Sequence, residues 1–291
     1  MSEGEQPLRR ALPFILLAGL CFSTLDATAK YLVQFHSLFL VVWARYAGQM
    51  LVTTPIAFQR GGPEFWRTRH LKVQLVRSLC LVIATACFFG GLRFLPLAEG
   101  TAVSYLAPMI GLLLAYPVLG ERPTRARWLA AVGGFVGILI LVRPGGAVFH
   151  PATLLLLGEA ASNALYQLLT RRLPHDASHT TLFYSGLVGT VLLSLALPFV
   201  ETPRAITWSD VFFLVMLGLM AGVGHWNLIV AFTRAPATLV APFTYVGMLW
   251  ATIYGFAVFG HLPDRWSVAG MAVIVASGIA LMAHERRAHR R

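Results

Sequence analysis

The sequence predicts an all-α membrane protein in which ten transmembrane helices form two inverted five-helix repeats, with both termini cytoplasmic. The composition gives the first reason, since 57% of the 291 residues are hydrophobic and only 12% are charged. Soluble globular proteins carry about 25% charged residues, so lipid rather than water is the expected solvent for most of this chain. A series of apolar segments and an internal repeat are the other two reasons.

Ten segments are apolar and long enough to cross a bilayer, for which about 20 residues are needed. Short connections that contain glycine, proline or charged residues separate them. The predicted spans are 12–35, 38–58, 71–93, 98–119, 126–143, 151–170, 180–199, 209–232, 238–259 and 266–283.

The positive charges set the expected orientation. Of the 23 Lys and Arg residues, sixteen lie on the side of the two termini, three lie inside spans, and four lie on the opposite side: Arg93, Arg143, Arg204 and Arg265. Cytoplasmic loops carry the excess of Lys and Arg, so both termini are expected in the cytoplasm. The net charge of +11 therefore reflects topology, and no nucleic-acid partner is expected.

An internal repeat divides the chain. Residues 95–128 and 235–266 match at a constant offset, which pairs Pro96 with Pro236, Tyr105 with Tyr245, Gly120 with Gly260 and Pro123 with Pro263. Two halves of five spans each, residues 1–146 and 147–291, must enter the membrane from opposite faces because five is odd. Inverted repeats of this kind place a binding site between the halves near the bilayer midplane.

Several ionisable side chains lie inside the predicted spans, where a charge costs at least about 2.5–3.5 kcal/mol and usually faces a cavity or a partner. Asp26 and Lys30 are four residues apart on one helix face, with Ser23 beside them, and Arg45 lies at a similar depth in the next span. Two interpretations stay open here. One is a buried ion cluster that locks the first two helices, and the other is a site for a zwitterion or a proton-coupled gate.

A polar face runs along the span 151–170. Glu159, Asn163 and Gln167 follow one another at intervals of four, with Tyr166 beside them. Steps of four rotate this stripe only slightly around the helix, and lipid does not accept such a face. We expect it to line a cavity.

Aromatic residues and a histidine complete the candidate site. Tyr105 and Tyr245 are related by the repeat, lie well inside their spans, and are followed or preceded by prolines that interrupt transporter helices. Trp250 and His225 are further candidates for substrate binding. Consecutive helix residues point about 100° apart, so the motif His225-Trp226-Asn227 leaves open which member faces a cavity.

No pattern in the chain predicts catalysis. The three cysteines, Cys21, Cys80 and Cys87, lie inside spans without the spacing of a disulfide framework or a metal site. No zinc-protease, nucleophile-elbow or phosphate-loop motif occurs. We therefore expect no catalytic residue, no metal and no cofactor, and a secondary transporter or facilitator rather than an enzyme or an ATP-driven pump.

The segment from Arg93 to Gly146, with its Leu-Pro-Leu-Ala, Gly-Glu-Arg and Arg-Pro-Gly motifs, resembles the end of an EamA domain of the drug/metabolite transporter superfamily. Arg234–Met282 resembles a weaker second copy, in which His261 replaces the usual acid and the closing Arg-Pro-Gly is absent. Bacterial aromatic amino-acid exporters of this superfamily are similar in size and layout. The resemblance implies ten helices in the bacterial inner membrane and a central cavity lined by Tyr105 and the region Asn163–Tyr166.

We therefore expect export of small metabolites by alternating access, with aromatic and large neutral amino acids favoured as substrates. A nucleotide-sugar or phosphorylated-metabolite carrier and a drug exporter are the alternatives within the superfamily, and a membrane scaffold or lipid-handling enzyme is the alternative outside transport. Phosphorylated substrates need several cavity cations, whereas Asp26 and Glu159 would offset two of Lys30, Arg45 and Arg77. The expected partners are a small-molecule substrate and the lipid bilayer, and a homodimer stays open.

Overall fold

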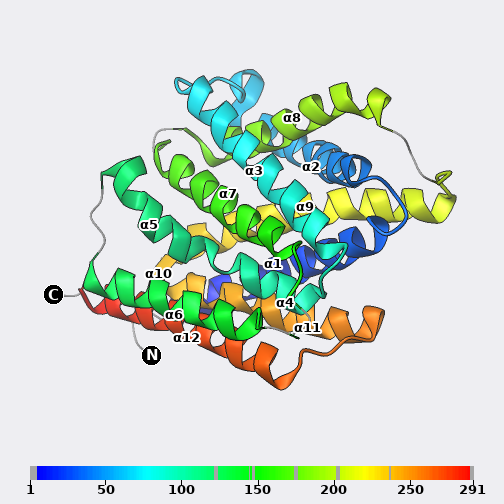
Figure 1. Cartoon of the computed structure of the whole chain (residues 1–291). Coiled ribbons are helices and arrows are strands. Elements are labelled where there is room, and N and C mark those ends of the chain that lie inside the picture. Colours follow the sequence, from blue (N-terminus) through cyan, green and yellow to red (C-terminus); the bar gives the residue numbers. More distant parts are fainter. Residues whose placement is uncertain are drawn as a thin grey trace.

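The computed structural model describes residues 5–120, 124–143, 145, 148–173, 176–200, 204–235 and 237–288, and all regular secondary structure within them is helical (Figure 1). The helices are α1 (Glu5–Leu32), α2 (Leu38–Gly61), η1 (Gly62–Glu64), α3 (Leu71–Leu92), α4 (Leu97–Ser104), α5 (Ala107–Leu119), α6 (Arg125–Leu141), α7 (Thr153–Arg171), α8 (Ser178–Ala196), η2 (Leu197–Phe199), α9 (Trp208–Arg234), α10 (Ala237–Val240), η3 (Ala241–Tyr245), α11 (Val246–Phe259) and α12 (Arg265–Ala288).

Each predicted span coincides with a helix or with a broken pair of helices. Seven segments are long and apolar enough to cross a membrane by length and composition alone. They contain α1, α3, α4–α5, α8, α9, η3–α11 and α12. The other three helices have identifiable reasons for falling short. α6 is only 17 residues long, polar residues such as Arg45 and Gln49 lower the mean hydropathy of α2, and the polar face of α7 does the same there.

The fourth and ninth predicted spans are interrupted, as their prolines predict. Pro108 stands in the first turn of α5, just after the α4–α5 break, and Pro242 lies within η3 between α10 and α11. Proline cannot donate the backbone hydrogen bond that would continue the preceding helix. The two repeat-related glycines, Gly120 and Gly260, end α5 and α11 in the left-handed conformation, at φ 75° and 67°, which favours glycine at both positions.

Helix packing repeats between the two halves. α1 packs on α9 and α11, and correspondingly α7 packs on α3 and α5. α2 packs on α9 as α8 packs on α3, while the pairs α2–α8 and α6–α12 join a helix to its own counterpart. α1 and α7 run in opposite directions, and the first turn of α1 and the last turn of α12 lie at the same end of the bundle (Figure 1).

Small residues allow the tightest helix crossings between the halves. Gly48 of α2 and Gly218 of α9 face each other so closely that a Cβ at Gly48 would lie 2.6 Å from the Gly218 Cα, and Gly222 faces Val52 one turn on. Gly137 of α6 and Gly270 of α12 meet in the same way. Membrane helices rely on such small residues because no hydrophobic effect drives their association within lipid.

We predict that Gly218→Ala lowers the thermal unfolding midpoint of the purified protein in detergent. The added Cβ would overlap the Gly48 Cα and come within 2.8 Å of the Ala44 carbonyl oxygen, and overpacking of this kind costs about 1–3 kcal/mol. Gly111→Ala is the matched control, since the nearest atom to its new Cβ is that of Ala164 at 3.8 Å. Equal unfolding midpoints for the two variants would contradict the close crossing.

Candidate functional site

A cavity of about 700 Å³ lies among helices of both halves. Its walls come from α1, α2, α3, α4, α5, α7, α9, η3 and α12. Nine of the residues predicted from sequence line it: Asp26, Arg45, Tyr105, Glu159, Asn163, Tyr166, Gln167, His225 and Tyr245. The cavity thus gathers residues from segments far apart in the chain.

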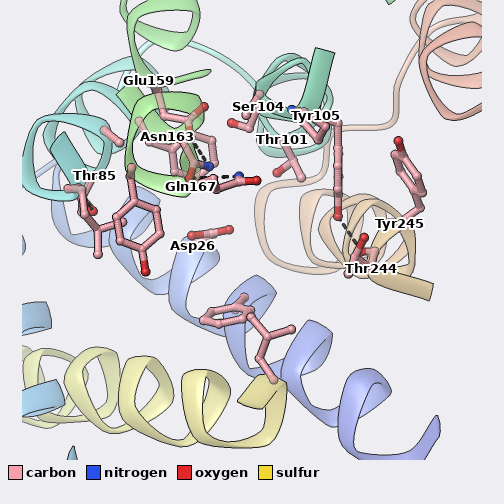
Figure 2. A pocket seen from close by; sticks show the side chains of 18 of the residues that line it. Asp26, Thr85, Thr101, Ser104, Tyr105, Glu159, Asn163, Gln167, Thr244 and Tyr245 are labelled. Carbon is pink, nitrogen blue, oxygen red and sulfur yellow. Dashed lines mark hydrogen bonds between the residues drawn. The ribbon is translucent and has the colours of Figure 1, made fainter. Parts of the chain in front are cut away.

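The polar face of α7 forms a hydrogen-bonded ladder along one wall. Asn163 Nδ2 donates to Glu159 Oε1 at 3.2 Å, and Gln167 Nε2 donates to Asn163 Oδ1 at 3.4 Å. Figure 2 shows these three side chains with the Asp26 carboxyl from α1 nearby. Within the described residues, Glu159 Oε2 is buried without a hydrogen-bond partner. The ladder therefore leaves one carboxyl oxygen available to a ligand or to water.

Arg45 contributes the cationic group of the cavity. Its side chain is 6% exposed, and the guanidinium lies over the ring of Tyr46, 4.5 Å from the ring centroid. Its Nη1 has no hydrogen-bond partner in the described part of the chain. A buried guanidinium with an unused donor is costly, which makes Arg45 a ready partner for an anionic group that enters the cavity.

Asp26 is the second acidic group that faces the cavity. It lies within electrostatic reach of Arg45, yet no ion pair joins it to Arg45 or Lys30 among the described residues. The predicted cluster of these three residues is therefore loose. One guanidinium and two carboxyl groups, Asp26 and Glu159, share the cavity without neutralising one another through direct contacts.

The repeat-related tyrosines meet at the boundary of the two halves. The rings of Tyr105 and Tyr245 have centroids 4.9 Å apart, inclined at 35°. The Tyr105 hydroxyl donates to the Thr244 carbonyl oxygen at 2.7 Å (Figure 2). Thr244 lies in η3 and Tyr105 at the end of α4, so the two helix breaks are held together beside the cavity.

Tyr166 is fixed by a buried arginine outside the cavity. The Arg77 guanidinium lies over the Tyr166 ring, 4.7 Å from the centroid. It donates to Thr170 Oγ1 at 3.0 Å, to the Thr181 carbonyl at 2.9 Å and to Ser185 Oγ at 2.8 Å, and also to Gln74. Arg77 is therefore a structural residue that joins α3, α7 and α8 and orients one aromatic wall.

The structure distinguishes the three consecutive polar residues of α9. His225 lines the cavity, with Nδ1 2.8 Å from the Ala221 carbonyl oxygen and its ring edge-on to Phe22. Trp226 lies beneath the Arg60 guanidinium at 4.5 Å, and Asn227 donates to the Val223 carbonyl at 2.8 Å. His225 is thus the member of the motif that faces the cavity.

Three residues predicted for the site lie outside the cavity lining, and Lys30 differs most. Its Nζ donates to the carbonyl oxygens of Leu92, at 2.7 Å, and Leu95, at 2.6 Å. Helical spacing does place Asp26 and Lys30 four residues apart, but the carbonyl groups at the α3–α4 turn attract the ammonium group to the end of the bundle.

Ser23 and Trp250 are the other two. The Ser23 hydroxyl donates to the Gly247 carbonyl oxygen at 3.1 Å and so joins α1 to α11. Trp250 of α11 lies beside Gly19 of α1. A Cβ placed on Gly19 would be 3.8 Å from Cδ1 of the Trp250 indole, which is an ordinary van der Waals contact. Both residues therefore lie at the contact between α1 and α11.

Sequence reasoning missed several residues of the cavity. The hydroxyl-bearing ones are Thr85, Thr101, Ser104 and Thr244, and the aromatic ones are Phe22, Phe88, Phe89 and Phe232. Single threonines and phenylalanines in apolar spans are common and carry no spacing signal, so only the packed helices identify them. Among the residues searched, no group of three or more His, Cys, Asp or Glu could hold a metal ion.

The cavity is asymmetric along the bundle. Its lining reaches Phe232 in the last turn of α9 and Leu281 and Met282 late in α12, toward the end that carries the termini. At the opposite end, His261 Nε2 lies 3.1 Å from Oε1 of the fully buried Glu99, and a second pair, Arg143 Nη2 and Asp264 Oδ2, is 2.6 Å apart. Both pairs join one half of the chain to the other.

Comparison with known proteins supports a transporter fold. A solved crystal structure shares the fold, with a TM-score of 0.67 at 21% identity over 95% of this chain and 98% of that one. A riboflavin transporter from Vibrio cholerae is 30% identical over 100% of this chain and 98% of its own length. An S-adenosylmethionine uptake transporter from Rickettsia prowazekii is 26% identical over 99% of this chain and 97% of its own. None of these relatives is named for amino-acid export.

The EamA-like transporter family matches twice, at residues 9–143 and 150–283. These two matches fall on the two halves in which the helix packing repeats. The drug/metabolite-type resemblance of the sequence is therefore confirmed, and a transporter rather than an enzyme is indicated. This chain, an integral multi-pass protein of the bacterial inner membrane, belongs to the EamA-like transporter family.

Proposed function

We propose that the protein is a secondary transporter for a small zwitterionic metabolite that carries a planar ring, and that the substrate binds in the central cavity. Amino acids with aromatic side chains are the smallest members of this class, and S-adenosylmethionine is a larger one. In this proposal ten spans cross the membrane as two inverted repeats, and the positive-inside distribution puts both termini in the cytoplasm.

The carrying observation is the set of ionisable side chains in the cavity that keep polar atoms without partners. Nη1 of Arg45 and Oε2 of Glu159 are buried without a partner among the described residues, and Asp26 faces the same space. A zwitterion satisfies such a set, because its carboxylate accepts from the guanidinium and its ammonium donates to a carboxyl group. The surrounding rings, among them Phe22, Phe88 and Tyr166, would cover a planar ring.

The cavity volume favours the larger members of this class. Pockets for drug-sized ligands measure about 300–1,000 Å³, and about 700 Å³ exceeds what a single amino acid fills. The S-adenosylmethionine transporters among the relatives fit a zwitterionic substrate of this size. Free amino acids, the substrates expected from sequence, are therefore one case within this wider proposed class.

A neutral ring system is the second candidate substrate. The Vibrio cholerae riboflavin transporter is 30% identical to this chain, and the cavity offers hydroxyl and amide groups for a polar ring: Thr85, Thr101, Ser104, Asn163 and Gln167. Such a substrate would bind by stacking and hydrogen bonds and would leave Arg45 unpaired. The two candidate substrates can therefore be separated by how strongly their transport depends on the charge of Arg45.

Two contacts between the halves at one end of the bundle support alternating access as the proposed mechanism. The cavity extends toward the proposed cytoplasmic end, while Glu99–His261 and Arg143–Asp264 join the halves at the other end. We infer an inward-facing form whose outer closure separates when the halves rock. Transport in both directions down a gradient is expected of such a device, with net export or uptake set by the substrate or ion gradient.

Transport into proteoliposomes is the direct test of the substrate class. Radiolabelled phenylalanine, tryptophan, S-adenosylmethionine and riboflavin are offered at equal concentration, with and without a pH gradient, and empty liposomes set the background. We expect uptake of the ring-bearing zwitterions above background. Riboflavin uptake alone would favour the second candidate. Uptake of all four compounds at the level of empty liposomes would contradict both candidates.

We predict that Arg45→Gln weakens the binding of a zwitterionic substrate by about 10- to 100-fold, measured as KM or as equilibrium binding. A hydrogen bond to a charged group contributes about 1.5–3 kcal/mol, which corresponds to this range. Arg45→Lys should lose less, because it keeps the charge but not the planar fork. Arg60→Gln, outside the cavity lining, is the control, and an equal loss there would contradict the role of Arg45.

We predict that Asp26→Asn separates the candidate substrates from each other. Loss of the carboxylate should reduce transport of substrates with an ammonium group about tenfold or more, by the same charge-assisted hydrogen bond. Riboflavin has no such group, so its transport should change little. Competition between labelled and unlabelled substrates in the variant provides the measurement, and a parallel loss for all of them would argue against contact with the ammonium.

A further inference from the structure

A second cavity lies at the end of the bundle where α2 ends and α3 and α8 begin. Its volume is about 990 Å³, and it is separate from the central cavity because the two share no lining residue. Its walls come from the η1–α3 connection and from the start of α8: Trp66, Arg67, Thr68, Arg69, His70, Leu71, Asp176, Ala177, Thr180 and Tyr184. Transport through the central cavity uses none of these residues.

The connection that forms one wall is fixed to α8 by hydrogen bonds. The Thr180 hydroxyl donates to the Phe65 carbonyl oxygen at 2.8 Å, and the Tyr184 hydroxyl donates to the Trp66 carbonyl oxygen at 2.8 Å. Thr68 Oγ1 donates to Asp176 Oδ2 at 2.6 Å. The cavity is therefore built by tertiary contacts.

Basic side chains outnumber acidic ones in the described lining of this cavity. Arg67, Arg69 and His70 line it, and Arg69 makes no hydrogen bond or ion pair within the described residues. Arg67 pairs at 2.8 Å with Glu64, but both side chains are more than 60% exposed, and such surface pairs contribute little. Asp176, the only acid among the described lining residues, already accepts from Thr68 and from Gln74 Nε2 at 2.8 Å.

Two helix N-termini add to the positive potential. α3 begins after His70 and α8 after Ala177, and neither N-cap side chain accepts a hydrogen bond from its helix. The first amide groups of a helix lack intrahelical partners and carry a partial positive charge, which favours anions such as phosphate. Both N-cap residues belong to the cavity lining, so the N-terminal ends of the two helices border the same cavity as the arginines.

The cavity also has the surroundings of a membrane interface. Trp66 is 51% exposed and Leu71 is 49% exposed, and both border the cavity. Tryptophan is enriched at the level of lipid headgroups, and apolar side chains beside a basic pocket can contact acyl chains. Basic pockets between transmembrane helices on the cytoplasmic side bind anionic headgroups.

We propose that this cavity binds the phosphate headgroup of an anionic phospholipid from the cytoplasmic leaflet, with Arg67 and Arg69 as the cationic contacts. The bound lipid would join the α2–α3 connection to α8 and stabilise the first half of the chain against the second. The site rests on the proposed orientation of the termini, and it is independent of the transported substrate.

Lipid-dependent stability tests the proposal with the full chain. The purified protein is reconstituted in nanodiscs of phosphatidylcholine, and phosphatidylglycerol is titrated in while the thermal unfolding midpoint is followed. We expect phosphatidylglycerol to raise the midpoint at low mole fraction. Arg67→Gln/Arg69→Gln should shift the half-saturating fraction upward by roughly 30-fold, since each arginine near the membrane surface contributes about fivefold.

The matched control removes the same charge from the same end of the bundle. Arg9→Gln/Arg125→Gln changes two exposed arginines outside the cavity, and it should keep the response of the parent protein. An equal shift of the half-saturating fraction in this control would show that the response depends on surface charge in general, and it would overturn the proposed site. No response of the parent protein to phosphatidylglycerol would overturn it as well.

A soluble ligand is distinguished by adding glycerol phosphate to the phosphatidylcholine nanodiscs at matched concentration. We expect no comparable rise of the unfolding midpoint, because the proposed ligand is held in part by its acyl chains. A rise equal to that caused by phosphatidylglycerol would overturn the lipid assignment in favour of a soluble phosphate compound. Proteoliposome transport of the Arg67/Arg69 variant, assayed separately, reports on the central cavity.

Discussion

The cost of keeping charge at membrane depth is the constraint on which this structure depends. Arg45 and Glu159 are buried with unused hydrogen-bonding atoms, and a buried polar or charged group without a partner is costly. The fold tolerates them because the α7 ladder holds one carboxyl oxygen of Glu159 and the Tyr46 ring covers the Arg45 guanidinium. What the protein leaves unsatisfied is available to a substrate, so the same groups that cost stability can give affinity.

The interrupted helices bring the two halves of the chain together beside the cavity that holds these buried groups. Proline breaks at Pro108 and Pro242 let Tyr105 and Tyr245 approach each other, and the Tyr105 hydroxyl satisfies a carbonyl group of η3. Non-helical backbone at membrane depth is tolerated where it lines a cavity. Glu99 and His261 join the halves at the far end, while glycine crossings such as Gly48–Gly218 let the halves pack closely.

Much of this was predictable from the sequence for a physical reason. Apolar length, proline breaks and the spacing of Glu159, Asn163 and Gln167 are local patterns, and the structure has helices, interruptions and a polar cavity wall at those positions. Lys30 was misplaced because its ammonium group reaches carbonyl groups that only the tertiary fold brings near. Isolated residues such as Thr85 or Phe22 carry no local pattern, and only packing assigns them to the cavity.

Coupling between the outer closure and transport is the most direct measurement of alternating access. In a background with Cys21, Cys80 and Cys87 replaced, Glu99→Cys and His261→Cys would be joined by a short bifunctional thiol reagent. We expect the cross-link to stop transport, reduction to restore it, and the same reagent to leave each single-cysteine protein active. Undiminished transport by fully cross-linked protein would contradict a path that opens at this end between the two halves.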